Sequence, residues 1–462
     1  MTPFLGKIRD WYLGLTTIMR SVLIGGVVVV IIGIVAYIWI AGGPGPMDFS
    51  GGEKVALANY HSADPTGVPA TLKSASLVKR GEYLARAADC VVCHTAKGET
   101  PYAGGFAFTL PFGTIYSTNI TPDKDTGIGN YTDAQFLAVM HRGVRKDGKR
   151  LYPAMPFASY TYMTDADALA IKAYLFSLSP VRAPAKANTL GFPFNQRWAM
   201  GIWAFFFNAD TRFAPDTAKS PEWNRGAYIA EALAHCGECH TPRNLAYALN
   251  NRKKFAGEVT AGWRAYNISS DRDSGIGAWS DDQVFAYLTA GHVLGHGTAS
   301  GPMGEAVDES FSQLAPEDMH AVVTYLRSVP ATSSDLPATL APAASPSHKQ
   351  GPMVADARGK EVFEGACASC HSWTGVSPIL PFATLTGARA VNDPNATNVA
   401  QIVISGTRRK TPQGVVSMPA FGASYSNAEI AAVANYVTAR FGSEGSRLTE
   451  SDVASLRRQS TQ

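Results

Sequence analysis

The pattern Cys-x-x-Cys-His occurs three times in this chain of 462 residues, and its three copies contain all six cysteines. In the chemistry that this spacing serves, each thiol adds to one vinyl group of a porphyrin, and the histidine that follows ligates the iron. We therefore expect three covalently bound haem c groups. Their attachment residues are Cys90, Cys93, His94, Cys236, Cys239, His240, Cys367, Cys370 and His371. The chain then has to fold around three porphyrins that cannot dissociate.

Two other uses of paired cysteines fit the pattern less well. A redox dithiol of the thioredoxin type also has the Cys-x-x-Cys spacing, but it does not explain a histidine after every copy. A zinc site needs two cysteine pairs that lie close together, whereas these pairs are widely separated in the sequence. No cysteine remains for a structural disulfide, so disulfides give no indication of the compartment.

A methionine flanked by proline or glycine residues follows each motif, shortly before the last helical pattern of its segment. These methionines are Met155, Met303 and Met418. A rigid, irregular loop can direct a thioether toward the iron, so we expect each iron to have one histidine and one methionine ligand. The other ring nitrogen of each histidine needs an acceptor, for which we expect a backbone carbonyl near Pro101, Pro242 or Pro378.

Residues 22–41 form a nearly unbroken apolar stretch, which as a helix matches the thickness of a bilayer. Lys7, Arg9 and Arg20 precede it and few basic residues follow, so the positive-inside rule places the N-terminus in the cytoplasm. A cleaved signal peptide is the alternative, but the apolar core of a signal peptide is shorter. We therefore expect a retained transmembrane anchor.

The formal net charge of the chain is only +3, and no dense run of lysine and arginine occurs. Surfaces that bind nucleic acid need such a concentration of positive charge, so we expect no nucleic acid partner. The length is sufficient for three or four domains of ordinary size.

Similar helical patterns surround each motif, which indicates one module used three times. A helical pattern with a glycine and an aromatic residue precedes each motif, as at Gly81 and Tyr83, and a helix with a tyrosine, such as Tyr174, ends each module. Glycine allows two helices to approach closely, and aromatic side chains fill the crossing. We expect each pair of helices to enclose a haem crevice.

The first two modules share an insert that the third lacks. Residues 119–129 parallel residues 267–277, and each insert runs into a helix start, at Thr132 or Ser280, with a glutamine three residues later. That pattern predicts a capping box at each helix. The Asp-x-Asp-x-Gly part superficially resembles a calcium loop, but it lacks the distal bidentate glutamate. We expect a turn that packs over the haem instead.

Two linkers separate the modules. One is rich in proline, alanine and serine and favours an extended tether. The other is rich in aromatic residues, and its apolar stretch 198–207 is too short to span a membrane. That stretch either packs against the modules or docks a partner subunit or the bilayer. We expect a cytoplasmic segment (1–21), the anchor (22–41), a linker (42–74), the first module (75–182), the aromatic linker (183–220), the second module (221–330), the tether (331–354), the third module (355–442) and a C-terminal tail (443–462).

Longer motifs extend beyond the haem attachment residues. They are residues 116–122 with 127–129, Leu151–Pro156 and Cys239–Arg243. Over residues 75–440 the chain resembles the three-haem cytochrome c subunits of membrane-bound, quinone-reducing periplasmic dehydrogenases of acetic acid bacteria, of the aldehyde or alcohol dehydrogenase type. The resemblance implies a mainly α fold, with three class I cytochrome c domains in tandem after one N-terminal transmembrane helix. The ligands of that family fall on the cysteines, histidines and methionines named above.

This resemblance implies electron transfer. Members of the family take electrons from a separate catalytic dehydrogenase subunit that carries pyrroloquinoline quinone, flavin or molybdopterin, in some cases with a small iron–sulfur or accessory subunit. They deliver the electrons to ubiquinone in the respiratory chain. The expected location is the bacterial inner membrane, with a single N-terminal anchor and the cytochrome domains on the periplasmic side. We expect no catalytic chemistry from the chain itself.

Residues 296–307 indicate the partner. They are more similar to the cytochrome subunits of molybdopterin aldehyde dehydrogenases than to those of alcohol dehydrogenases. We therefore expect an aldehyde dehydrogenase. An alcohol, gluconate or other polyol or sugar dehydrogenase is the alternative in the same role. Two further alternatives are a c-type subunit of a terminal oxidase and a multihaem peroxidase, and the peroxidase requires a five-coordinate iron.

Overall fold

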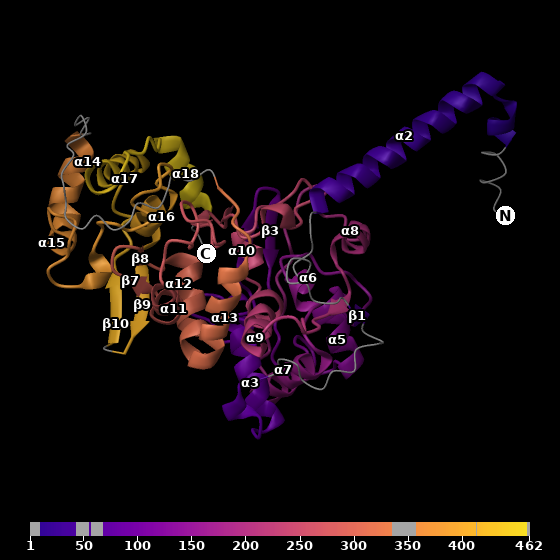
Figure 1. Ribbon diagram of the computed structural model, residues 1–462, viewed down its shortest axis with the longest axis horizontal. Helices are drawn as coiled ribbons and strands as arrows, with labels where there is room; N and C mark the ends of the chain where they lie inside the picture. Colours follow the sequence, from indigo (N-terminus) through magenta and orange to yellow (C-terminus); the bar gives the residue numbers. More distant parts are fainter. Residues whose placement is uncertain (1–9, 43–54, 57–67, 335–356, 413, 460–462) are drawn as a thin grey trace.

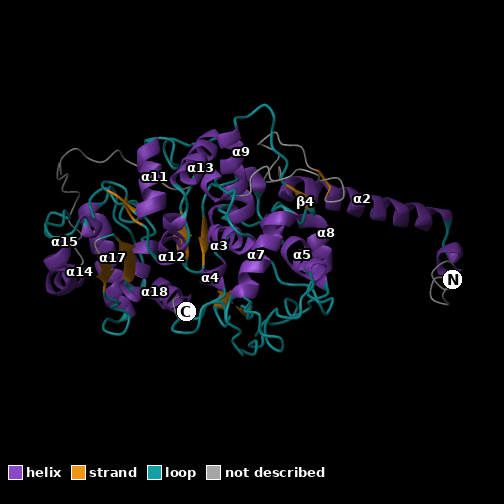
Figure 2. Ribbon diagram, turned by 90° about the horizontal axis from the view of Figure 1, so that it is seen from below, coloured by secondary structure: helices purple, strands orange, loops and turns teal. Residues whose placement is uncertain are grey.

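The computed structural model describes residues 10–42, 55–56, 68–334, 357–412 and 414–459, in which helices dominate (Figure 1, Figure 2). Helix α2 (Thr17–Gly42) extends away from the rest of the molecule. Its residues Thr17–Tyr37 form the one helix in this described part that is long and apolar enough to cross a membrane, with a mean hydropathy of 2.6. The helix begins before the expected residue 22 because the polar residues that precede the apolar stretch are also compatible with a helix.

The first module is built around two crossing helices with the haem motif between them in the chain. Its elements are α3 (Leu77–Ala87), α4 (Cys90–Cys93), β2 (Ala107–Leu110), β3 (Gly113–Tyr116), α5 (Asp133–Arg142), α6 (Phe157–Tyr160) and α7 (Asp165–Ser177), preceded by the short helix η2 (Ala70–Leu72). Strands β2 and β3 form an antiparallel hairpin, and the other named strands of the described residues also pair antiparallel, two by two. A short aromatic helix, α8 (Ala199–Phe207), follows, and strand β1 (Val55–Ala56) pairs with β4 (Thr211–Arg212).

The second module repeats this plan. Its elements are α9 (Pro221–Tyr228), η3 (Ile229–Leu233), α10 (Gly237–His240), η4 (Asn251–Lys253), β5 (Glu258–Thr260), β6 (Trp263–Ala265), α11 (Asp281–Ala290), β7 (His292–Val293), β8 (Gly297–Thr298), α12 (Gly301–Glu309), η5 (Phe311–Gln313) and α13 (Pro316–Ser328). Helix α13 crosses α9 as α7 crosses α3. The extra hairpin of β7 and β8 has no named counterpart in the first module.

The third module is shorter and lacks the shared insert. Its elements are α14 (Ala357–Val362), η6 (Phe363–Cys367), α15 (Ala368–His371), η7 (Pro381–Ala383), α16 (Thr397–Ser405), β9 (Thr407–Thr411), β10 (Gly414–Met418), α17 (Asn427–Phe441) and α18 (Glu450–Gln459). The tether expected at residues 331–354 lies mostly outside the described residues.

In each module a glycine on the first α-helix, α3, α9 or α14, touches a later helix, α7, α13 or α17. A Cβ atom on this glycine would overlap a backbone carbonyl of the later helix, and the Cβ atom of a tyrosine one turn later lies against it. The glycine, alanine and tyrosine sets are Gly81, Ala170 and Tyr174; Gly226, Ala321 and Tyr325; and Gly359, Ala432 and Tyr436. The predicted crossing of two helices through glycine and aromatic residues is therefore confirmed in all three modules.

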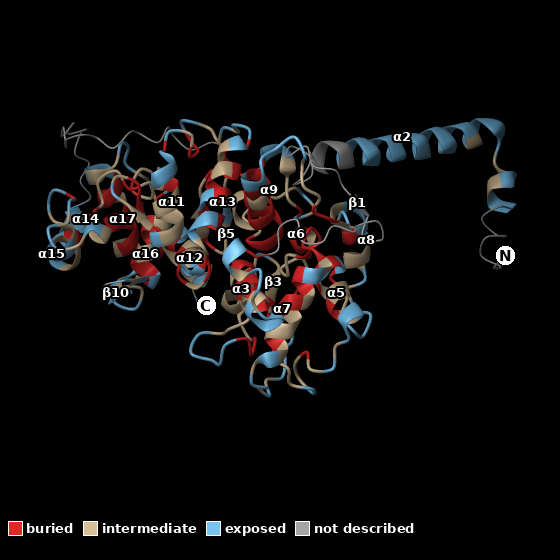
Figure 3. Ribbon diagram, turned by 60° about the horizontal axis from the view of Figure 1, so that its bottom comes forward, coloured by how far each residue is buried: buried red, intermediate tan, exposed pale blue. Residues whose placement is uncertain are grey.

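The buried side chains of the described residues form two cores. One continuous core includes residues from both the first and the second module, such as Leu84 and Tyr325, and from the segment between them, such as Phe213. A separate core lies within the third module. Figure 3 shows the buried parts of α3, α7, α9 and α13 close together, and those of α16 and α17 apart from them. The first two modules therefore form one packed unit.

A reciprocal pair of contacts joins the first two modules. Tyr83 on α3 donates a hydrogen bond to Asp318 on α13, and Tyr228 on α9 donates one to Asp167 on α7 at 2.6 Å. Both tyrosines lie two residues after the crossing glycine, so the two contacts use equivalent positions of the repeat. Each carboxylate also forms an ion pair with an arginine of its own module. Contacts that recur with the partners exchanged are the pattern of a two-fold interface.

The shared inserts form closed turns. The predicted capping boxes are present at Thr132 and Ser280. Asp123 accepts hydrogen bonds from the backbone amide and the hydroxyl of Thr126, at 2.6 and 2.8 Å, and these bonds lower the pKa of its carboxyl group. Asp271 in the second insert is bonded to its own loop in the same way. The first carboxylate of each loop is therefore engaged within its turn.

The C-terminal residues 443–462, expected to be a tail, contain helix α18. Its Val453 is fully buried in the core of the third module, and Leu448 and Leu456 pack against the same core. The helix contacts α16 and α17. Val453 and Leu456 lie three residues apart on one face of α18, and this apolar face is why the segment docks instead of remaining a tail.

The aromatic linker both packs and exposes its side chains. In α8, Trp203 donates to the carbonyl of Ala246 at 2.9 Å and stacks edge-on with Phe157. Phe205 and Trp198 are 80% and 70% exposed. Figures 1, 2 and 3 place α8 close to the end of α2 from which the modules follow. One part of this segment thus packs against the modules, and another part remains available for contact.

Candidate functional site

The six cysteines lie in or beside three short helical turns. Cys90 and Cys93 begin and end α4, Cys236 caps α10, which contains Cys239, and Cys367 and Cys370 lie in η6 and α15. All six are free thiols, five of them partly buried and Cys370 exposed. Residues three apart on a helical turn lie on one face, so each pair presents both sulfurs on the same side.

The thiols are poor candidates for redox chemistry. Burial raises the pKa of Cys90 and of Cys236 to about 12, and that of Cys239 and of Cys367 to about 11. A redox dithiol needs a lowered pKa, because the thiolate is the attacking species. Within the described residues, no three His, Cys, Asp or Glu side chains are grouped to hold a bare metal ion. Both observations count against the alternative uses of these cysteines.

Each histidine of the three motifs is held by a backbone carbonyl. His94 Nδ1 donates to Thr118 at 2.7 Å, His240 Nδ1 to Tyr266 at 2.6 Å, and His371 Nδ1 to Ala383 at 2.6 Å. A carbonyl acceptor was expected, but the positions near Pro101, Pro242 and Pro378 were not the right ones. Thr118 and Tyr266 follow hairpins and Ala383 ends the short helix η7, and no sequence pattern indicated that these segments return to the motifs.

These hydrogen bonds determine what the imidazoles can bind. Because Nδ1 carries the proton, Nε2 is the nitrogen with a free lone pair in each ring. Burial lowers the pKa of His94, His240 and His371, so the rings are neutral. A neutral imidazole with an oriented second nitrogen is the form that ligates a metal. Two thiols and one such imidazole per turn fit the donor set of a covalently attached haem.

The three methionines lie in different local structures. Met155 lies in the turn before α6, as expected for a loop residue. Met303 lies in the first turn of helix α12, and Met418 is the last residue of strand β10. The expected loop setting is therefore wrong for these two. Gly301 and Pro302 begin helix α12, so Met303 is helical. Gly414 begins strand β10 after the hairpin turn, and the strand continues to Met418.

The structure brings some of these groups together through shared cores. Cys90 and Met155 pack against the core of the first two modules, and Cys367 and Met418 pack against the core of the third. Helix α12, with Met303, contacts α11 and β6 of its own module and also α4 of the first module. All three methionines are partly buried. A thioether in this setting can serve as the second axial ligand.

A buried polar group in the second module was not predicted. The ring of His296 stacks on Trp279 at 3.8 Å, and burial together with the charge of Arg389 lowers the pKa of His296 to about 4. His296 Nδ1, Trp279 Nε1 and Nε2 of nearby His292 have no hydrogen-bond partner. His296 begins the stretch that had indicated an aldehyde dehydrogenase partner, but nothing in the sequence showed that its ring is buried.

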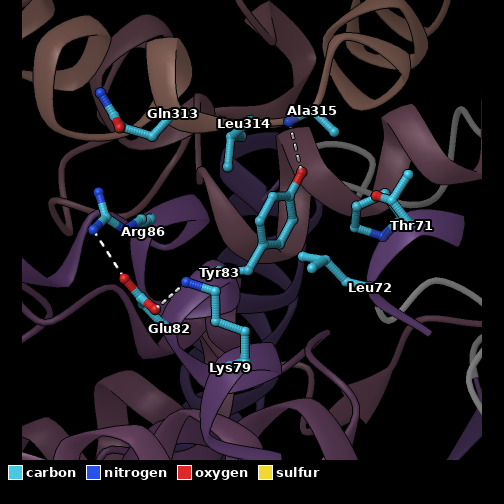
Figure 4. Close-up of a pocket in the computed structure, with 10 residues that line it drawn as sticks. Thr71, Leu72, Lys79, Glu82, Tyr83, Arg86, Gln313, Leu314 and Ala315 are labelled. Atoms are coloured by element: carbon cyan, nitrogen blue, oxygen red, sulfur yellow. Dashed lines mark hydrogen bonds and ion pairs between the residues drawn. The ribbon is translucent and has the colours of Figure 1, made fainter. Parts of the chain in front are cut away.

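A surface cavity lies between the first two modules, away from the haem motifs. It has a volume of about 390 Å³, and Tyr83 and Leu314 face each other across it (Figure 4). Glu82 in its wall pairs with Lys79 at 2.7 Å and with Arg86 at 3.0 Å. None of the proposed haem ligands lines it. The cavity is therefore a feature of the junction between the modules, not of the candidate site.

Two protein families match segments of this chain, and several known proteins are similar to it over most of its length. The family described as "Cytochrome c" matches residues 78–179, and the one described as "Cytochrome C oxidase, cbb3-type, subunit III" matches residues 354–437. The fructose dehydrogenase cytochrome subunit of Gluconobacter japonicus is 39% identical over 87% of each chain. The gluconate 2-dehydrogenase cytochrome c subunit of Pantoea cypripedii is 38% identical over 84% of this chain and 90% of its own. The alcohol dehydrogenase (quinone) cytochrome c subunit of Gluconobacter oxydans is 35% identical over 83% and 82%.

Proposed function

Because the chain belongs to the family of cytochrome c subunits of dehydrogenases, we propose that it carries three haem c groups and relays electrons from a catalytic subunit to ubiquinone. The observation that supports this best is the threefold repetition of one geometry. Each motif has two thiols on a helical turn and a histidine whose Nδ1 donates to a backbone carbonyl. A bound haem would supply one-electron chemistry at each of these places.

The proposed axial ligands are one histidine and one methionine for each iron. His94 would act with Met155, His240 with Met303, and His371 with Met418. Six-coordinate irons favour electron transfer because no position is open for oxygen or peroxide. A thioether ligand also raises the reduction potential, which suits an acceptor of electrons from an organic substrate. The peroxidase alternative needs one iron that lacks its methionine.

The packing of the modules supports a relay in which the second module lies between the other two. Ser159 in α6 donates to Glu238 of the second haem motif at 2.9 Å, and α12 contacts the first motif. On the other side, Arg264 of the second module donates through its backbone amide to Asn398 of the third at 2.8 Å. The second haem would thus have a neighbour on each side.

The proposed partner is an aldehyde dehydrogenase, on the basis of residues 296–307. A sugar or polyol dehydrogenase is the second candidate, because the fructose dehydrogenase cytochrome subunit covers 87% of the chain. In either case the catalytic subunit would carry molybdopterin, pyrroloquinoline quinone or flavin. A small iron–sulfur or accessory subunit would complete the complex.

The proposed location is the bacterial inner membrane, with α2 as a retained anchor and all three modules in the periplasm. The length and apolar composition of Thr17–Tyr37 support the anchor. Arg20 lies near the start of this helix, and its side chain donates to the carbonyl of Tyr12 at 3.1 Å. This basic residue is on the side of the membrane expected to be cytoplasmic.

The test is isolation of the intact complex from detergent-solubilised membranes. Mass analysis of this chain should show three added haems, and the largest co-purifying subunit should contain the cofactor of a dehydrogenase. Addition of an aldehyde should reduce all three haems, and ubiquinone should reoxidise them. Fewer than three haems, or co-purification with a copper-haem oxidase subunit in place of a dehydrogenase, would contradict the proposal. Reduction by fructose or a polyol, and not by an aldehyde, would favour the second candidate.

Rapid binding of carbon monoxide separates a carrier from an enzyme. Three six-coordinate haems should bind carbon monoxide slowly in the reduced native protein. Rapid binding at one haem would favour the peroxidase, because that iron would have an open position.

A further inference from the structure

One arginine of the third module lies inside the second module. Arg409 belongs to strand β9, and only 1% of its surface is exposed. Its guanidinium donates to the carbonyl of Gly304 at 2.6 Å and to that of Ala290 at 3.5 Å, and it forms an ion pair with Asp308 at 3.0 Å. All three partners belong to the second module. The side chain therefore crosses the junction between the two modules completely.

The contacts of Arg409 fix helix α12, whose third residue is Met303. The guanidinium donates to the carbonyl of the residue after Met303, in the first turn, and forms an ion pair with Asp308 near the end of the helix. The backbone amide of Lys410 adds a hydrogen bond to Asp308 at 3.0 Å. Ser300 at the N-cap makes no side-chain cap. Because a short helix without a cap is marginal by itself, these contacts add to the packing against α11, β6 and α4 that holds α12 in place.

The site is shaped for a guanidinium group. A Cβ atom on Gly291 or on Gly304 would press against the side chain of Arg409, so both positions leave room for it. A buried guanidinium loses its hydration and is tolerated where hydrogen bonds and an opposite charge replace water. Its planar group of donors reaches the carbonyl at the end of α11, the carbonyl of Gly304 and the carboxylate of Asp308 at the same time. The single ammonium group of a lysine could not do this.

The strand that carries Arg409 also belongs to the hairpin that carries Met418. Strand β9 pairs with β10, where Met418 lies opposite Thr407. Helix α12 contacts β9, and Figure 1 shows it beside this hairpin. The proposed methionine ligands of the second and third haems are thus connected through one buried side chain.

We propose that Arg409 positions Met303 on the iron of the second haem, so that docking of the third module completes the ligation of its neighbour. This inference rests on the proposed function, in which Met303 is that ligand. Cys236 and Cys239 would hold the porphyrin covalently, independently of α12. Loss of the arginine therefore leaves the second haem attached and displaces its sixth ligand.

The experiment compares substitutions in the full-length protein, by absorbance of the oxidised form and by potentiometric titration. Arg409→Met should remove one haem's share of the red charge-transfer band that marks methionine ligation of ferric iron. It should also lower the potential of that haem alone and allow carbon monoxide to bind it rapidly, with three haems still attached. The neighbouring exposed residue gives the matched control, Arg408→Met, which should match the unsubstituted protein in all three readouts.

A third substitution separates this inference from the proposed function. Met303→Ala should remove the same haem's share of the band. If Met303→Ala leaves the band intact, Met303 is not a ligand and the ligand assignment fails. If Met303→Ala removes that share but Arg409→Met does not, the ligand assignment stands and the positioning role of Arg409 is wrong.

Two further variants keep the test informative if Arg409→Met alone fails to fold. Asp308→Asn keeps both carbonyl bonds of Arg409 and should give an intermediate loss of the band. The double variant Asp308→Asn with Arg409→Met leaves no unpaired buried charge, so it should fold with three haems and show the full loss. Retention of the complete band in this double variant would overturn the inference.

Discussion

Each histidine of the three motifs is oriented by a backbone carbonyl, and this choice affects the iron it is expected to bind. A carboxylate acceptor would make the imidazole more basic, whereas a neutral carbonyl fixes the ring with a smaller electronic effect. His94, His240 and His371 share this arrangement. Differences in potential among the proposed haems would then arise mainly from burial, nearby charges and the proposed methionine ligands.

The burial of His296 predicts that the stability of the protein depends on pH. Its pKa is lowered to about 4 in the folded state, whereas an unfolded histidine titrates near pH 6.5. Between these values the unfolded state binds more protons, so stability should fall as the pH is lowered from about 6.5 to 4, by at most about 3 kcal/mol. The pH profile of the thermal midpoint should therefore be flatter for His296→Phe, which keeps a ring to stack on Trp279. Parallel profiles for the two proteins would contradict this assignment.

The crossing helices are the elements that the sequence predicts best. A glycine before each haem motif and a tyrosine in a later helix recur in all three modules, and this repetition made the contact predictable although its two sides lie far apart in the chain. The capping boxes at Thr132 and Ser280 were predictable for another reason, because each depends on residues three apart. Contacts marked by no repeated or local sequence pattern were missed, including the carbonyl acceptors of the histidines, the docking of α18 and the position of Arg409 inside the second module.

The helix crossing gives a prediction with a matched control. In Gly226→Ala the added methyl group would overlap the carbonyl of Ala321, so α9 and α13 have to separate. We expect a loss of stability of about 1–3 kcal/mol, with less haem incorporated into the second module. In Gly201→Ala, within α8, the methyl group meets nothing within 4 Å. This control should be neutral or stabilising by up to about 1 kcal/mol, because alanine favours a helix. Equal denaturation midpoints for the two variants would refute the close-packing argument.

At the scale of the whole molecule, the two cores define two units of unfolding. The first and second modules share one core, whereas the third has its own. Scanning calorimetry of the purified protein should therefore show two transitions, the larger from the first two modules together. Three transitions of similar size would show that the shared core does not couple the first two modules. This grouping was not predictable, because a repeated sequence pattern does not show which modules share a core.

The anchor makes a second prediction at this scale. Deletion of residues 1–42, with a cleavable signal peptide in their place to direct export, removes α2, the candidate membrane span, and should release the haem-loaded protein from membranes washed with alkaline carbonate. Deletion of residues 1–16 leaves α2 whole and should keep the protein in the membrane fraction. If the longer deletion also remains bound after the wash, another surface holds the protein, and the exposed aromatic side chains of α8 are the first place to examine.

The exchange of partners between Tyr83 with Asp318 and Tyr228 with Asp167 has a consequence for ancestry. Two identical single-haem chains could form both contacts as a symmetric dimer, and a gene duplication that joined them end to end would preserve the interface. The third module has Glu361 at the position of these tyrosines. It cannot make the same exchanged pair of contacts, and the buried side chain of Arg409 joins it to the second module instead.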